Sequence, residues 1–177
     1  MMLIKKEFRE KALEKSLLAL ENDLENNFDK IIKRIVQDYD LLFKSIKKSN
    51  KKVAYVNFYI LRTNFKVGRE YCLLKAYTKD WYLDTKPIEL AHDASYVYGH
   101  FYNYSKEMLT EQKRYIAYRP FEARRYMILQ WEIYIPYIVF LVKASLDEII
   151  KLDSYNFEKD KDFKMYVGEY KDMMVEI

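Results

Sequence analysis

Apolar residues recur at every third or fourth position through the first fifty residues of the chain. No glycine or proline occurs before Gly68, so nothing in this stretch interrupts the pattern. This spacing places apolar side chains on one side of an α-helix, and it predicts that residues 1–50 are helical. The sequence ENDLENN leaves two alternatives open: one long helix, or two helices with Asn27 as the cap of the second. The repeating positions are Leu13, Leu17, Leu20, Leu24, Phe28, Ile31, Ile35, Leu42 and Ile46.

The pattern changes between residues 53 and 82, where β-branched and aromatic residues dominate. The segments VAYVNFYIL and YCLLKAY have the composition of strands, and NFKVGR between them holds the first glycine. These features predict a β-hairpin. Because a lone hairpin is only marginally stable in water, it needs helices or another strand beside it. The segment FKMYVGEY, in the acidic tail 153–177, is the candidate for that strand.

Two more helices are predicted after the hairpin. Thr85 and Pro87 suit the start of a helix over residues 87–115, because threonine caps free amides and proline fits the first turn. A second helix over 120–152 is expected to bend or break at Pro136. The resulting fold class is α+β, mainly helical, and 177 residues suit a single domain.

The nearly all-apolar segment 126–142, YMILQWEIYIPYIVFLV, raises the alternative of a membrane span. Its length is at the short limit for spanning, and Glu132 near its middle would cost roughly 2.5 to 3.5 kcal/mol in lipid. In a helix, the charged residues fall on one stripe and the larger apolar residues on the other side. This asymmetry favours a core helix. The charged stripe is Arg125, Glu132 and Lys143, and the apolar one is Ile128, Trp131, Ile135, Val142, Leu146 and Ile149.

Composition and motifs narrow the class of protein. One cysteine, Cys72, excludes an intrachain disulfide and fits a reducing compartment, and the N-terminus lacks the pattern of a secretory signal, so we expect a cytoplasmic protein. Three isolated glycines leave no glycine-rich phosphate loop and no nucleophile elbow. No cofactor is therefore expected. Cys72 itself is interpreted as a small buried hydrophobe on a strand.

Both histidines lie in the stretch HDASYVYGH. On the predicted helix, His92, Tyr96 and His100 share the side that faces solvent. The histidines are eight residues apart, about 12 Å along a helix axis, whereas paired metal ligands on a helix are normally four apart. No metal site is expected. A polar patch with acid–base capacity is one hypothesis for this stretch. Asp80, Trp81 and Asp84 of YTKDWYLDTKP form a separate acidic and aromatic corner that could hold a cation or a basic peptide.

Two segments are basic. KSIKKSNKK, residues 44–52, is a lysine run at the end of the first helix, where cations interact favourably with the helix dipole. KRYIAYRPFEARRY, residues 113–126, interleaves arginines with tyrosines, a combination that suits an acidic protein surface or single-stranded nucleic acid. The alternative is that its arginines pair with the carboxylates of the acidic tail. The candidate contact residues are Arg114, Tyr115, Tyr118, Arg119, Arg124 and Arg125.

These patterns predict a small cytoplasmic, non-enzymatic protein that binds another macromolecule. Another protein is the expected partner, in the role of a regulator, adaptor or neutralising partner. A nucleic-acid-binding module that uses residues 113–126 is the alternative, although a net charge of +4 is low for that class. An enzyme with a dispersed histidine and carboxylate site is the third hypothesis.

Overall fold

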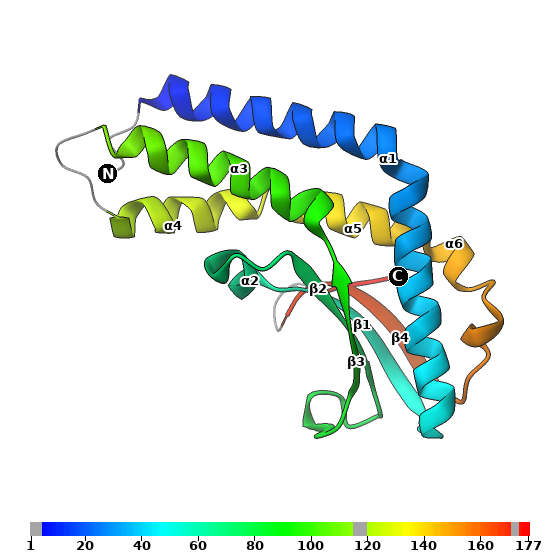
Figure 1. The fold of residues 1–177 in the computed structure, drawn as a ribbon. Helices are drawn as coiled ribbons and strands as arrows, with labels where there is room; N and C mark the ends of the chain where they lie inside the picture. The colour runs from blue at the N-terminus through cyan, green and yellow to red at the C-terminus, as the bar shows by residue number, and fades with distance from the viewer. Residues whose placement is uncertain (1–4, 115–119, 171–173) are drawn as a thin grey trace.

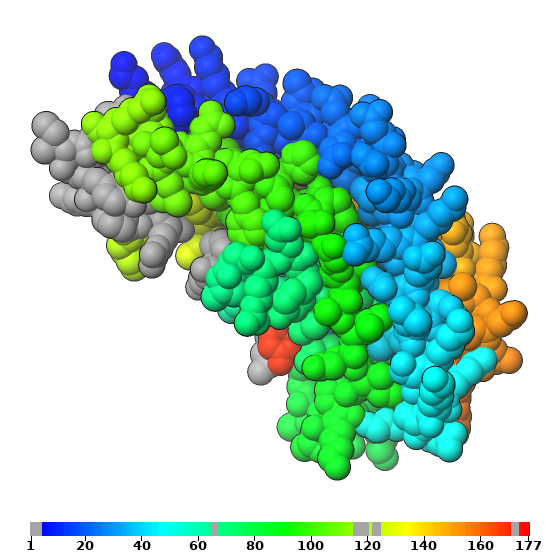
Figure 2. Space-filling model, viewed as in Figure 1, coloured from blue at the N-terminus to red at the C-terminus, as the bar shows by residue number. Residues whose placement is uncertain are grey.

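The computed structural model describes residues 5–114, 120–170 and 174–177, without the side chains of residues 65, 66, 120 and 122–124. It has the mainly helical α+β architecture that the sequence predicts. A layer of helices lies above the sheet, and the second half of α1 descends along the sheet (Figures 1 and 2). The elements are α1 (Lys6–Ser49), β1 (Val53–Ile60), α2 (Arg62–Val67), β2 (Tyr71–Tyr77), η1 (Trp81–Leu83), β3 (Ile88–Asp93), α3 (Ser95–Gln112), α4 (Pro120–Trp131), α5 (Ile135–Ala144), α6 (Leu146–Ile149), η2 (Asp153–Tyr155), β4 (Lys159–Glu169) and β5 (Met174–Glu176).

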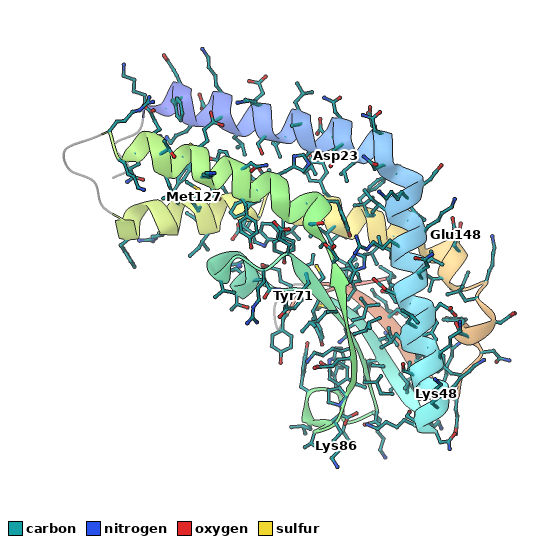
Figure 3. The ribbon with its side chains drawn as sticks, in the orientation of Figure 1. Asp23, Lys48, Tyr71, Lys86, Met127 and Glu148 are labelled. Atoms are coloured by element: carbon teal, nitrogen blue, oxygen red, sulfur yellow. The ribbon has the colours of Figure 1, made fainter. Side chains whose placement is uncertain are left out.

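Residues Lys6–Ser49 form one helix, which resolves the choice between one helix and two. α1 changes direction shortly after Asp23, so that its first half lies along α3 and its second half covers the sheet (Figures 1 and 3). At the bend, the side-chain amides of Asn26 and Asn27 donate to the carbonyls of Asn22 and Asp23. Such side-chain bonds to the helix backbone accompany bends, and here they let one helix serve two layers.

Within the described residues, the sheet has five strands in the order β3-β2-β1-β4-β5. β1 and β2 pair antiparallel, which confirms the predicted strand pair, although α2 lies between them in place of a tight turn. β4 adds to the other edge of β1 in parallel and β5 pairs antiparallel with β4. The C-terminal tail therefore joins the sheet, as FKMYVGEY predicts.

The prediction that a helix begins at Pro87 is wrong for the first two turns of that helix. Residues Ile88–Asp93 form β3, which pairs antiparallel with β2, and the helix begins at Ser95. Burial alternates along the segment, since Ile88, Leu90 and His92 are more buried than Glu89 and Ala91, and this period of two suits a strand at the edge of a sheet. The Asp93 carboxylate accepts a hydrogen bond from the Ser95 amide, 2.8 Å away, and so satisfies one free donor at the helix start.

The late helical region is divided into α4 and α5. The turn at residues 132–134 precedes Pro136, which sits in the first turn of α5 where its missing N–H costs no hydrogen bond. Trp131, Val142 and Ile149 are fully buried, whereas Arg125, Glu132 and Lys143 are exposed. The asymmetry predicted from the sequence is confirmed at these positions.

The core is aromatic. Trp131 contacts Tyr98 and Phe101 of α3, with ring centroids 4.6 and 5.1 Å apart, and joins α3 to α4. Tyr39 of α1 stacks on Phe58 of β1 at 6.5 Å and joins α1 to the sheet. Aromatic pairs of this kind add to the free energy of burial, so these rings are a main source of cohesion between the layers.

Candidate interaction surface

His92 lies on β3 and is fully buried, so the prediction that it faces solvent is wrong. Its Nδ1 is 2.7 Å from a carboxylate oxygen of Asp38, and its Nε2 is 2.9 Å from the hydroxyl of Tyr96. Burial raises the pKa of Tyr96 well above its usual range, which keeps the phenol neutral. The three side chains thus provide hydrogen-bond partners for one another and connect α1, β3 and α3. We interpret this network as a stabilising contact of the fold.

His100 belongs to a separate pair. Its Nε2 is 3.0 Å from a carboxylate oxygen of Asp23, and its ring is about one-fifth exposed. In the parts of the chain that the structure describes, no three His, Cys, Asp or Glu side chains gather closely enough to hold a metal ion. The two histidines are therefore anchored to α1 at different places and do not form a joint site.

Cys72 lies on β2 opposite His92 and is fully buried, which confirms its interpretation as a small core residue. Burial raises the pKa of its thiol far above the usual range. A thiol must ionise to act as a nucleophile, so this environment opposes covalent catalysis.

The Trp81 corner covers the side of the sheet that faces away from α1. Trp81 stacks on Tyr55 with ring centroids 4.0 Å apart and contacts Tyr166 at 5.4 Å. The carboxylate of Asp84 accepts hydrogen bonds from the amides of Lys86 and Thr78; burial alone would raise its pKa, but these bonds leave it below its usual range. Asp84 is thus used by its own loop, and Trp81 packs as a cover over the sheet.

The basic segment 113–126 falls only partly within the described residues. Arg114 is exposed and forms an ion pair with Glu111 at 2.6 Å. Tyr115, Tyr118 and Arg119 lie outside the described residues, as does the side chain of Arg124. Arg125 is exposed at the outer side of α4.

Lysines of the run at residues 44–52 contact the acidic tail. Lys52 pairs with Asp160 at 3.6 Å, and Lys47 donates to the backbone carbonyl of Asp153. Neither Arg114 nor Arg125 pairs with a tail carboxylate in the described part of the structure. The alternative that these two arginines neutralise the tail is therefore wrong.

A groove of about 830 Å³ lies between α3 and α4 and includes Arg125 in its lining. Its lining is largely apolar, and three cations border it. Among the described side chains, none of these three cations forms an ion pair. We call it the basic groove; the apolar residues that define it are Phe101, Leu109, Phe121, Met127 and Ile128, and the cations are Lys106, Lys113 and Arg125.

Large apolar side chains also project from the outer side of α4 and α5, which follow one another along a single line (Figure 1). Phe121, Leu129, Ile133 and Phe140 are 77%, 53%, 37% and 59% exposed. Leu129 lies eight residues after Phe121 on α4, about 2.2 helical turns, Ile133 lies in the turn between the two helices, and Phe140 follows on α5. We call these four exposed side chains the apolar ridge. Exposed apolar surface of this extent is typical of interaction sites.

The apolar ridge belongs to a stretch with membrane-like composition. Among the described residues, Arg125–Ile149 is long and apolar enough to cross a membrane, and 33% of its most apolar window is buried in the structure. Glu132 lies within this stretch and is 3.4 Å from Arg62 of α2. The inner side of this stretch thus packs in the core, whereas its outer side, which carries the ridge, is not covered by any of the described residues.

No family model, no curated protein and no solved structure matches the chain. Sequence reasoning identified Arg125 but missed Leu129, Ile133 and Phe140, which it treated only as part of a core helix. A signal was present, because α5 is apolar on nearly every side, and a helix of that kind is either enclosed or binds something on its outer side.

Proposed function

We propose that this protein acts by binding another protein, through the apolar ridge and the basic groove beside it. The observation that carries the proposal is the exposure of Phe121, Leu129, Ile133 and Phe140 on α4, α5 and the turn between them. Burying such side chains contributes about 1.5 to 3 kcal/mol each, which is the usual source of affinity at protein interfaces.

The charges around the basic groove indicate the chemistry of the expected partner. Lys106, Lys113 and Arg125 surround an apolar floor and have no carboxylate partner among the described side chains. An amphipathic helix with apolar residues on one side and carboxylates at its margins would satisfy both features. The expected partner is therefore an acidic, amphipathic segment, and the role is that of a regulator, adaptor or neutralising protein.

Nucleic acid is the second candidate, supported by the same three cations. Phosphates would accept from them, but the apolar lining of the groove offers nothing to a sugar–phosphate backbone. The stacking that would favour single strands was assigned to Tyr115 and Tyr118, which lie outside the described residues. Salt dependence separates the two ligands, because each phosphate contact changes the slope of log affinity by about 0.7 to 0.9.

The test is fluorescence anisotropy with a synthetic amphipathic helical peptide that carries leucines on one side and glutamates at its margins. We expect it to bind at least about tenfold more tightly than the same peptide with lysines in place of the glutamates, a difference of about 1.4 kcal/mol. Leu129→Ser should weaken binding about tenfold or more, whereas Leu83→Ser should not, because Leu83 is 83% exposed on η1, away from the ridge.

Equal binding of the two peptides, or equal effects of the two leucine substitutions, would reject the proposed site. A labelled single-stranded oligonucleotide is measured in parallel. Tighter binding of the oligonucleotide than of the acidic peptide, with a steep loss in salt, would replace the protein partner by nucleic acid.

A further inference from the structure

A second groove, of about 660 Å³, lies between α1 and α5. Its floor is apolar, like that of the basic groove, but the charged residues at its border are Glu21 and Glu25. Glu21 accepts a hydrogen bond from the hydroxyl of Tyr137, 2.7 Å away, and both carboxylates are exposed. We call this the acidic groove; its apolar residues include Leu24, Phe28, Pro136, Phe140 and Leu141.

The two grooves flank the same apolar ridge near its opposite ends. Phe121 borders the basic groove and Phe140 borders the acidic groove. At 1.5 Å per residue, these phenylalanines are roughly 25 to 30 Å apart along the helices. In Figure 3, Met127 of the basic groove and Asp23, next to the acidic groove, lie toward opposite ends of the helical layer.

The sequence strengthens this separation of charge. Residues 21–29 of α1 contain four acids and no base: Glu21, Asp23, Glu25 and Asp29. The basic groove carries three cations and no acid in its lining. One molecule therefore presents an apolar ridge that is positive near one end and negative near the other.

We propose that the partner of the ridge is a second copy of this chain, bound antiparallel. This inference rests on the proposed function, since it names the occupant of the same surface. A two-fold axis across the middle of the ridge places the acidic groove of each copy against the basic groove of the other. The interface is then self-complementary, with every charge contact made twice, as in most symmetric dimers.

Opposite charges at the two ends also select the orientation. A parallel dimer would set the cations Lys106, Lys113 and Arg125 against the same cations of the other copy. An anionic membrane would attract the basic end and repel Glu21 and Glu25 at the other. The antiparallel arrangement is the one in which both ends attract, and it covers Phe121 and Phe140 together.

The test is sedimentation velocity with the full chain and two charge-reversal variants. One variant carries Lys106→Glu with Arg125→Glu, and the other carries Glu21→Lys with Glu25→Lys. We expect the unaltered protein to be a dimer at concentrations on the order of 100 µM or below, and each variant alone to dissociate at least about tenfold more readily. An equimolar mixture of the two variants should form a heterodimer, because both ends then carry opposite charges.

The control carries Lys79→Glu with Lys86→Glu, which makes the same change in net charge as Lys106→Glu with Arg125→Glu, at two exposed positions away from the ridge. It should dimerise like the unaltered protein. If circular dichroism shows that a reversal variant is unfolded, the neutral pairs Lys106→Gln with Arg125→Gln and Glu21→Gln with Glu25→Gln replace it, with a smaller expected loss.

A monomeric unaltered protein, a dimer indifferent to the reversals, or a mixture that stays monomeric would each overturn the self-association. If in any of these cases the acidic peptide still binds and Leu129→Ser still weakens it, the proposed function survives and the partner is a different protein. Co-sedimentation with vesicles of phosphatidylglycerol and phosphatidylcholine, without a dimer, would assign the ridge to a lipid surface and overturn both.

Discussion

The imidazole of His92 connects three elements through two hydrogen bonds. It lies on β3, and its nitrogens contact Asp38 of α1 and Tyr96 of α3. Buried polar groups are costly unless every member of the network is paired, and here each side chain supplies the partner of the next. The polar residues of HDASYVYGH are thus used in holding the helical layer to the sheet.

We predict that His92→Leu lowers the free energy of unfolding by about 2 to 4 kcal/mol, because it leaves a carboxylate and a phenol without their partner. His100→Leu is the matched control: its ring is partly exposed and pairs with Asp23 at the surface, so its loss should cost less than about 1 kcal/mol. Urea unfolding measures both. Similar losses for the two variants would contradict the structural role given to His92.

At the scale of single elements, the two glycines on helices differ in what they require. Gly68 ends α2 with a φ of 69°, in the left-handed region that favours glycine. Gly99 lies inside α3, and an added Cβ there would meet nothing within 4 Å. The open space around Gly99 shows that no described atom approaches it closely enough to require a glycine.

We predict opposite effects of alanine at these two positions. Gly99→Ala should raise the free energy of unfolding by about 0.5 to 1 kcal/mol, since alanine restricts the unfolded chain and fits the helix. Gly68→Ala should lower it by about 1 kcal/mol because of backbone strain. Thermal unfolding would show the two shifts as a few degrees in opposite directions. Two shifts of the same sign would disagree with these backbone assignments.

The elements differ in how far the sequence determined them. A long periodic pattern was sufficient for α1, and β-branched and aromatic composition was sufficient for β1, β2 and the strand of the C-terminal tail. β3 was missed because its six residues follow Pro87, which favours a helix start, and because their polarity does not alternate beyond Leu90. The grooves could not be predicted, since they depend on how α3, α4 and α5 pack against α1, and single-sequence patterns contain no distances between helices.

At the scale of the whole molecule, the apolar ridge and the core share the same two helices. Trp131, Ile138 and Leu141 point inward and are fully buried, while Leu129 and Phe140 point outward. The membrane-like composition of α4 and α5 therefore comes from two apolar surfaces: an inner one that packs in the core and an outer one, the ridge, that we propose binds a partner.

We predict that the protein expressed without detergent remains in the supernatant, because the inner side of Arg125–Ile149 is satisfied by the fold and Glu132 is paired with Arg62. Fractionation with a carbonate wash is the measurement. Recovery in the washed membrane pellet alone would show that this stretch spans a bilayer. Leu129→Ser and Phe140→Ser should leave the distribution unchanged if the ridge binds protein.

The parallel pairing of β1 with β4 also governs how the chain can reach its fold. Val53 pairs with Lys159 and Ile60 with Glu169. The central strand of the sheet therefore pairs with a strand about one hundred residues later in the sequence. Contacts of such long range slow folding, and an unpaired strand is open to pairing with other chains. During synthesis β1 can gain β2 early, but its other edge stays uncovered until β4 has left the ribosome, and in that interval the nascent chain is most exposed to aggregation.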